Sequence, residues 1–479
     1  MSASIATLLY AAVIAGLFWL DRDKARTSFA LWIPIIWLSL AGSRSASEWL
    51  QSARPGASSE ALLEGDPLNR AVYSGLLALG LLVLLFRGAK VARVLQTNGA
   101  IVLFLLYCAL SLTWAEYPDV GFKRLAKAVG DFVMILIVVS DREPTVAIRR
   151  FLIRPGFLLI PLSVLMIKYY PDLARYYDRW DWTTYYSGVA TNKNALGAIC
   201  LLFGLASAWQ FLAALSGRQR TGRVRRLIAH GTILAMVAWL FWLARSMTAL
   251  ACFLLALCLL VALELRRASH PGDPNAQSVL VNRMMLHTLV AISIIVPSVV
   301  LFIGIEPVLR MLGRSPTLTD RTLVWDLLLD QTSNPLFGTG FENFWLGSRL
   351  ERIWSVYSWA PNQAHNGYLE TYLNLGWVGV ALLALVLASG YRTVMIATRR
   401  FPSPGTLMLA YFVVGVVYNF TEAALFRMVT PVWIVLLLAI TRIPASETAR
   451  QQRLSGRAIQ RAIRGPASGD PATVVSRQA

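Results

Sequence analysis

The sequence predicts an all-α polytopic membrane protein with about 12 or 13 transmembrane helices and one long loop on the outer side of the membrane. Three observations support this fold class. Hydrophobic residues make up 56% of the 479 residues, and charged residues only 15%. Apolar runs recur along almost the whole chain. The arginines between these runs gather in alternate loops, as they do in multi-pass membrane proteins.

Each predicted span is an apolar run that approaches the length of roughly 20 residues needed to cross a bilayer. In chain order the runs are 5–20, 28–42, 71–86, 99–114, 124–139, 151–168, 192–214, 227–243, 247–265, 284–304, 374–396, 405–421 and 429–441. The first run has neither a charged segment before it nor an A-x-A cleavage site, so we expect a retained helix and not a signal peptide.

The formal net charge of +19 does not indicate a nucleic-acid partner, because the basic residues lie beside predicted spans on one set of loops. These basic loops are 22–26, 87–93, 142–150, 218–226, 266–283 and 399–400, and the positive-inside rule places them in the cytoplasm. The loop 305–373 then lies outside, where its acidic residues roughly balance its arginines. Lys123, Arg124 and Lys127, at the outer end of the fifth span, are a local exception.

Two domains are expected: a transmembrane domain, 1–443, which includes the outer loop 305–373, and a basic tail, 444–479. The tail is polar and arginine-rich, which is typical of a partly disordered cytoplasmic segment near anionic lipid. All four cysteines, Cys108, Cys200, Cys252 and Cys258, lie within predicted spans, so the sequence shows no disulfide framework.

Two cations stand where helix dipoles disfavour them. The seventh, ninth and eleventh spans all start on the outer side, and Lys193 and Arg245 lie at the starts of the first two. We expect Asn192, Ser246 and Asn362 to be the capping residues at the three starts. A cation at a helix N-terminus costs roughly 0.3 to 1 kcal/mol. A bound phosphate group would offset this cost, whereas in the alternative both side chains simply reach the lipid headgroups.

His365 is the only histidine expected on the outer face, because His230 and His287 lie near inner span ends and His270 lies in a cytoplasmic loop. A single histidine is often structural. Its position beside Asn366, at the start of the eleventh span, instead favours a general base. In the same loop, Gly338 and Gly340 indicate a tight turn or a close backbone approach.

The only close acidic pair expected on the outer face is Asp178 and Asp181, with Asp172 nearby; it could alternatively hold a divalent ion, but it is interleaved with arginines and aromatic residues. We interpret segment 169–186 as an interfacial region rich in Tyr and Trp, whose rings could alternatively stack on sugars. The sequence contains no Walker-type or dinucleotide-binding glycine loop. Neither a metal nor any other cofactor is therefore expected.

At these residues the sequence resembles the O-antigen ligase and Wzy-type polysaccharide polymerase superfamily, over most of the chain. The similar segments are Asn192-Lys193-Asn194, Ala244-Arg245-Ser246-Met247-Thr248-Ala249, Leu318-Thr319-Asp320-Arg321-Thr322, the Pro-x-x-Gly-x-Gly turn from Pro335, and His365-Asn366-Gly367-Tyr368-Leu369. Asp320 stands where the family usually has glycine, so the turn beside Arg321 can differ. Segments 42–50 and 64–70 are similar to the exopolysaccharide polymerase branch.

The resemblance implies a GT-C-like, metal-independent, inverting glycosyltransferase in the bacterial inner membrane, with its active site facing the periplasm. The implied donor is an undecaprenyl-diphosphate-linked oligosaccharide and the acceptor is a glycan, with polysaccharide export or chain-length proteins as candidate partners. His365 and Arg321 would be catalytic, and the substrate would be bound by Lys193, Arg245, Asn192, Asn366 and Glu422. Cations would stabilise the leaving diphosphate while His365 takes the acceptor proton.

Two other functions stay open at this stage. A ligase would use the same site but transfer the glycan to lipid A core or to a protein. A transporter would move the lipid-linked glycan without bond chemistry; it would not need an outer histidine and would show pseudo-repeat halves with broken helices, which the sequence does not reveal.

The arginine distribution generates a prediction about topology. Single cysteines introduced into the loop 305–373 should react with a membrane-impermeant reagent added to intact cells, whereas cysteines in 218–226 should react only after permeabilisation. Labelling of 218–226 from outside intact cells would show that the orientation is wrong.

Overall fold

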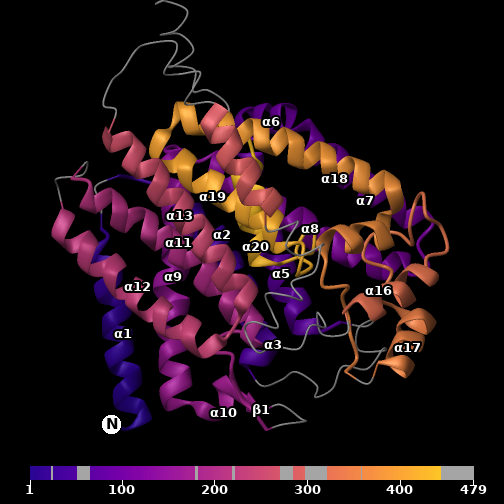
Figure 1. Ribbon diagram of the computed structural model, residues 1–479, viewed down its shortest axis with the longest axis horizontal. Helices are drawn as coiled ribbons and strands as arrows, with labels where there is room; N and C mark the ends of the chain where they lie inside the picture. Colours follow the sequence, from indigo (N-terminus) through magenta and orange to yellow (C-terminus); the bar gives the residue numbers. More distant parts are fainter. Residues whose placement is uncertain are drawn as a thin grey trace, which may run out of the picture. The chain divides into compact units, whose positions relative to one another are not determined.

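A computed structural model describes residues 1–22, 25–50, 65–177, 182–217, 222–269, 284–296, 321–357 and 359–443. The described chain is almost entirely helical, which confirms the predicted all-α class (Figure 1). Several predictions lie outside these residues: the 318–320 part of the family pattern, His270, Asp178 and Asp181, and the tail 444–479.

Seven described helices are long and apolar enough to cross a membrane, judged by length and composition. They are α1 (Ala3–Leu20), α5 (Pro67–Leu85), α9 (Pro144–Tyr169), α11 (Lys193–Leu215), α12 (Arg223–Ala244), α13 (Met247–Ser269) and α18 (Gly367–Arg400). An eighth span is obtained if α6 (Gly88–Thr97) and α7 (Gly99–Leu110), which are bent by 88°, are taken together. The chain is therefore a multi-pass membrane protein, as predicted.

The remaining elements are shorter or more polar. Shorter apolar helices are α2 (Trp32–Ala41), Met284–Val296, α19 (Pro402–Tyr418) and α20 (Pro431–Ile440). α8 (Pro118–Val139) is long but carries five charged residues. Three short helices are α3 (Ala46–Trp49), α10 (Pro171–Ala174) and α17 (Gly347–Val356), and α16 covers Arg321–Asp330. Each of the thirteen predicted apolar runs coincides, at least in part, with one of these described helices.

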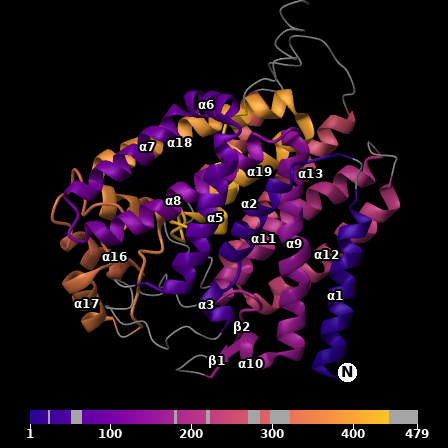
Figure 2. The same ribbon diagram turned by 180° about the vertical axis from the view of Figure 1, so that it is seen from behind.

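The core lies around α11, whose residues are buried over almost its whole length and which packs against α9, α12 and α13. Such a helix can be apolar all round because neighbours cover every face. α1, in contrast, packs mainly on α9 and α12 at the edge of the bundle and exposes Leu8, Leu9 and Trp19 (Figures 1 and 2). Its exposed apolar face is suited to lipid.

α18 is broken near its start. Gly376 has φ 62° and ψ −165°, which interrupts the helical hydrogen bonds. The loop before the helix supplies replacements, because the N–H groups of Trp377 and Val378 donate to the carbonyls of Pro335 and Leu336 at 2.9 and 3.2 Å. Tyr107 of α7, which runs beside α18, donates its hydroxyl to the Leu375 carbonyl at 3.0 Å. A broken helix at membrane depth needs such partners.

These hydrogen bonds between the loop and α18 explain the Pro-x-x-Gly-x-Gly turn. Gly338 and Gly340 have φ values of 69° and 95°, and a Cβ on Gly338 would lie 2.4 Å from the backbone of Asn374. The turn 335–340 therefore approaches α18 closely, as the two glycines predicted. The broken helix itself was not anticipated from the sequence.

The loop 305–373 is more structured than the polar loop that the sequence predicted. Its described part contains α16 and α17, which enclose an apolar cluster with the first turns of α18. The buried members of this cluster are Val324, Leu328, Phe344, Trp345, Leu350, Ile353, Ala364 and Leu373. The cluster fixes the loop onto the helix start where His365 lies.

The aromatic segment 169–186 contains the two described strands, an antiparallel pair of β1 (Arg175–Tyr177) and β2 (Thr184–Tyr186). Tyr176 pairs with Tyr185, and both tyrosines lie beside the start of α11. The hairpin thus brings aromatic side chains to the helix start that carries Lys193.

The break in α18 generates a stability prediction. In Gly376→Ala, the new Cβ would meet the Leu336 carbonyl at 2.3 Å, and the left-handed backbone alone would cost about 1 to 3 kcal/mol. We expect a clearly lower melting temperature of the detergent-solubilised protein. Gly75→Ala in α5 is the control, because its Cβ would meet no atom within 4 Å. Equal melting temperatures for the two variants would contradict this account of the break.

Candidate functional site

The starts of α11, α13 and α18 converge on one region, as the span order predicted. The amide of Asn194 in α11 donates to Glu422 Oε1 at 3.2 Å, and His365 Nδ1 lies 3.2 Å from Glu422 Oε2. Thr248 in α13 shares a hydrogen bond of 3.2 Å with Thr421. Gly197 lets α11 approach Ser246 closely, because a Cβ there would lie 2.8 Å from the serine hydroxyl.

A cavity of about 480 Å³ opens at this convergence, and we call it the His365 cavity. Its polar lining comes from the α11 start, from the residues before α18 and from the segment 419–430 between α19 and α20. These residues include Thr191, Asn192, Lys193, Asn194, Gln363, His365, Glu422, Arg427 and Thr430. Ligand-binding pockets in proteins have volumes of this order, and a small number of polar groups in them fixes the orientation of the ligand.

Glu422 is the centre of this site, since its two oxygens contact different helices. It is held by Asn419, whose side-chain oxygen accepts from the N–H groups of Ala424 and Leu425 at 2.7 and 2.9 Å. The carbonyl of Asn419 also accepts from Gly367 N–H at 2.8 Å, at the start of α18. One buried asparagine thus positions both Glu422 and the helix start that follows His365.

His365 is partly buried, with 20% of its side chain exposed, and has a left-handed backbone with φ 50°. Its Nδ1 faces Glu422, so Nδ1–H donating to the carboxylate leaves Nε2 as the acceptor nitrogen. The ring of Trp359 lies 6.3 Å from the imidazole and is 47% exposed. The histidine therefore has an orienting partner on one side and an open aromatic face on another.

Glu370, which sequence reasoning missed, holds the backbone next to His365 in place. The buried carboxylate accepts from Trp345 Nε1 at 2.6 Å and from the N–H of Ala364 at 2.9 Å. The amide of Asn374 donates to it at 3.3 Å. Because Ala364 directly precedes His365, these bonds fix the backbone that presents the imidazole. The signal in the sequence was an acidic residue within an apolar helix, which is costly to bury and therefore indicates a specific partner.

Lys193 is the first residue of α11, and Asn192 caps the helix by accepting from Ala195 N–H at 2.9 Å. Both line the His365 cavity. The Lys193 ammonium lies 3.8 Å from the centre of the Tyr185 ring, and the backbone N–H of Lys193 donates to the Tyr176 hydroxyl at 3.2 Å. The hairpin thus supplies part of the compensation that this cation needs at a helix N-terminus.

Arg245 connects α12 to α13 with a left-handed backbone of φ 49° and has an exposed side chain. It lies near the convergence but does not line the His365 cavity. Arg321 begins α16, and its side chain lies outside what the structure describes. The structure therefore brings Lys193, Asn192, His365 and Glu422 together, and leaves the two arginines as predictions.

The expected cap at Asn362 is wrong. α18 begins at Gly367, and Asn366 caps it by accepting from the N–H groups of Tyr368 and Leu369 at 3.0 and 3.1 Å. Asn366 is buried and does not line the His365 cavity, so its observed contacts are those of a helix cap. The loop continues four residues further than the asparagine pattern suggested because Glu370 holds Ala364.

Arg427 is a second residue that sequence reasoning missed. It lines the His365 cavity and donates to Gln363 Oε1 at 2.7 Å. Its signal was an arginine in the short segment between the last two predicted spans. The cavity therefore contains two described cations, Lys193 and Arg427, which are suited to an anionic ligand.

The basic residues Lys123, Arg124 and Lys127 line a separate pocket of about 380 Å³ with Arg70, Asp66 and Tyr73. Arg124 also contacts the carboxylate of Glu342 at 4.0 Å. Within the described residues, no group of three or more His, Cys, Asp or Glu side chains is placed to hold a metal ion.

Residues 230–384 match the model of the O-antigen ligase family. The exopolysaccharide production protein ExoQ of Rhizobium meliloti (strain 1021) is 23% identical over 297 residues, which are 60% of this chain and 63% of ExoQ. The alignment thus spans less than two thirds of that relative. These findings confirm the resemblance seen in the sequence. The family match contains Arg245, Arg321 and His365 but neither Lys193 nor Glu422.

The Glu370 contacts generate a prediction about stability. Glu370→Ala leaves the buried donors of Trp345 and Ala364 without an acceptor, at a cost of about 1 to 3 kcal/mol for each group. We expect a large drop in melting temperature, and a smaller one for Glu370→Gln, which keeps one acceptor. Glu116→Ala is the control, because that side chain is 48% exposed. A melting temperature of Glu370→Ala equal to that of the control would show that these bonds do not support the loop.

Proposed function

We propose that this chain, a member of the O-antigen ligase and Wzy-type superfamily, is a glycosyltransferase that polymerises lipid-linked oligosaccharide repeat units. The donor is an undecaprenyl-diphosphate-linked oligosaccharide, and the reaction takes place at the periplasmic face of the inner membrane. The relative ExoQ is an exopolysaccharide production protein, which favours polymer synthesis over other transfers.

The observation that carries the proposal is the His365–Glu422 pair inside a cavity that also contains Lys193 and Arg427. A histidine oriented by a carboxylate has a fixed tautomer, and its second nitrogen can accept a proton. Nearby cations suit a leaving group that carries phosphate charge. A base and an anion site in one cavity are the two requirements of transfer from a lipid diphosphate.

The reaction then has a simple balance. The acceptor hydroxyl loses its proton to Nε2 of His365 while its oxygen forms a bond to the anomeric carbon of the donor. The bond from that carbon to the diphosphate oxygen breaks, and the lipid diphosphate leaves with the electron pair. Attack from the face opposite the leaving group inverts the anomeric carbon. Lys193, Arg245 and Arg321 stabilise the charge that develops on the diphosphate.

A ligase is the second candidate, because the family model that matches residues 230–384 is that of O-antigen ligase. The two functions share a donor and a base and differ in the acceptor. The lipid-linked oligosaccharide, supplied alone to the reconstituted protein, separates them. A polymerase lengthens the glycan, whereas a ligase requires a second acceptor. Transport without chemistry is less well supported, because the residues at the break in α18 do not line the His365 cavity.

We predict that loss of the His365 imidazole removes turnover but not donor binding. His365→Asn is the preferred variant, because asparagine tolerates the left-handed backbone that this position requires. Polymer formation in proteoliposomes should fall by a factor on the order of 10² or more. Binding of radiolabelled donor should remain, whereas Arg245→Ala should weaken donor binding by about tenfold or more.

His287→Asn is the matched control, since this histidine contacts Tyr391, lies outside the cavity and should support polymer formation at the wild-type rate. Wild-type polymer formation by His365→Asn would contradict the role of general base. Loss of donor binding in this variant as complete as in Arg245→Ala would do so as well.

A further inference from the structure

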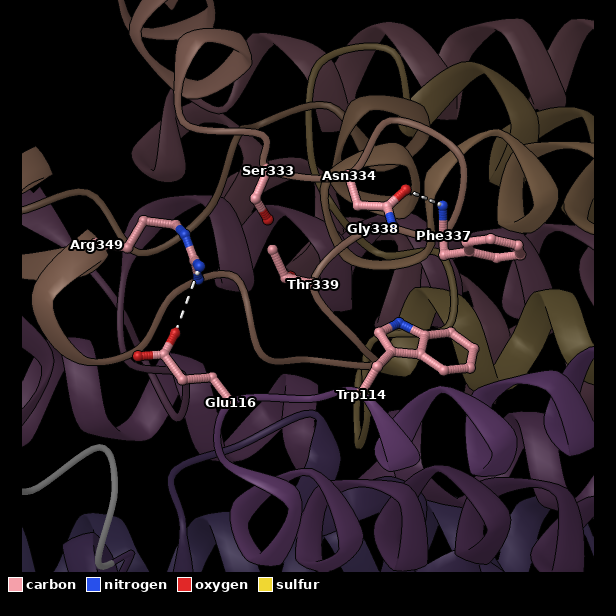
Figure 3. A pocket seen from close by; sticks show the side chains of 8 residues that line it. All are labelled: Trp114, Glu116, Ser333, Asn334, Phe337, Gly338, Thr339 and Arg349. Atoms are coloured by element: carbon pink, nitrogen blue, oxygen red, sulfur yellow. Dashed lines mark hydrogen bonds and ion pairs between the residues drawn. The ribbon is translucent and has the colours of Figure 1, made fainter.

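A further pocket, separate from the His365 cavity, lies beside the turn 333–340 and α17. It has a volume of about 500 Å³ and is lined by Trp114, Glu116, Ser333, Asn334, Phe337, Gly338, Thr339 and Arg349 (Figure 3). We call it the Trp114 pocket. It shares no lining residue with the His365 cavity. Its walls are the segment between α7 and α8 on one side and the turn 333–340 with the first turn of α17 on the other.

The pocket combines apolar rings with unused hydrogen-bonding groups. Trp114 and Phe337 are 37% and 41% exposed, with ring centres 5.8 Å apart. Asn334 uses its side-chain oxygen to hold the turn, accepting from Leu336 and Phe337 N–H at 3.1 Å, so its amide N–H groups are left for another partner. The indole nitrogen of Trp114 and the Ser333 hydroxyl face the same space (Figure 3).

The charge of the pocket argues against a phosphate. Its one arginine, Arg349, is paired with Glu116 at 3.4 Å and lies 5.3 Å from the Phe344 ring. A phosphate group would have to approach the Glu116 carboxylate, which repels it. The same ion pair and the polar wall disfavour a lipid chain. A neutral ligand with one apolar face and several hydroxyl groups fits both the aromatic wall and the polar wall of the pocket. A pyranose ring is such a ligand.

The pocket is linked to the His365 site through the loop core. Arg349 lies on Phe344, and the next residue, Trp345, donates to Glu370, which also accepts from Ala364 beside His365. The two sites are therefore connected by a chain of contacts that runs through Phe344 and Trp345.

We propose that the Trp114 pocket binds a sugar ring of the glycan at a distance from the reacting end. Trp114 and Phe337 contact the C–H face of the ring, while Ser333, Asn334 and the Arg349–Glu116 pair bond its hydroxyl groups. The proposal rests on the proposed glycosyl transfer, because only then is a glycan the ligand. Retention of a distal sugar between transfers would favour long products.

The test uses the full chain in nanodiscs and lipid-free oligosaccharides released by partial hydrolysis of the host cell's exopolysaccharide. Binding is measured by titration calorimetry. Trp114→Ala should weaken binding by about tenfold, the change expected for one aromatic contact. Glu116→Gln, at a half-exposed position, should weaken it without lowering the melting temperature. Trp242→Ala is the matched control, because that exposed tryptophan lies on α12, outside the pocket, and should bind as wild type does.

A second readout is product length from the lipid-linked donor. Trp114→Ala should give shorter polymer while the rate of the first transfer is unchanged. Wild-type binding by both Trp114→Ala and Glu116→Gln, or equal loss in Trp242→Ala, would overturn the inference and leave the transferase proposal standing. Conversely, oligosaccharide binding that depends on Trp114 in a protein that makes no product from the lipid-linked donor alone would refute the proposed polymerase and leave this inference standing. His365→Asn should bind the lipid-free oligosaccharide as wild type does, and a weakening equal to that in Trp114→Ala would assign the binding to the His365 cavity.

Discussion

The position of the loop 305–373 depends on two backbone hydrogen bonds between the turn 335–340 and the residues that follow the break of α18 at Gly376. Once α18 is interrupted, the N–H groups of Trp377 and Val378 need acceptors, and unpaired groups near lipid are costly. The carbonyls of Pro335 and Leu336 meet this need, which ties the loop to the helix. The apolar cluster under α16 and α17 then packs on the same helix start. The position of the loop is therefore set by hydrogen bonding and by hydrophobic burial together.

The residues of the site are positioned from the start of α18 by a short series of hydrogen bonds. Asn419 holds the beginning of α18 and the turn that carries Glu422, while Glu370 holds the residue before His365. Glu422 then connects His365 to Asn194 of α11. One carboxylate thus joins the start of α11 to the residue before the cap of α18. The anion-binding side, with Lys193 against the Tyr185 ring, is built independently by the hairpin.

The parts of this arrangement that are local in sequence were predictable. Hydropathy gave the spans, the asparagine before Lys193 gave the cap of α11, and the glycine pair gave the close approach of the turn. Long-range pairing was not predictable. The partner of His365 is 57 residues away and that of Asn194 is 228 residues away, and no periodicity relates them. The cap of α18 was misplaced because Asn362 and Asn366 are equally good caps in isolation, and only the tertiary contact of Glu370 with Ala364 decides between them.

The break at Gly376 also relates the position of the loop to the tilt of α18 in the bilayer. The part of α18 that follows the glycine is the long apolar span, and its tilt must adjust to the thickness of the surrounding bilayer. The carbonyls of the turn 335–340 are bonded to the first two residues after the break, so a change of tilt must either be absorbed at Gly376 or displace the turn. To the extent that Gly376 does not absorb the change of tilt, these two hydrogen bonds couple lipid composition to the geometry of the turn 335–340, without any lipid having to reach the cavity.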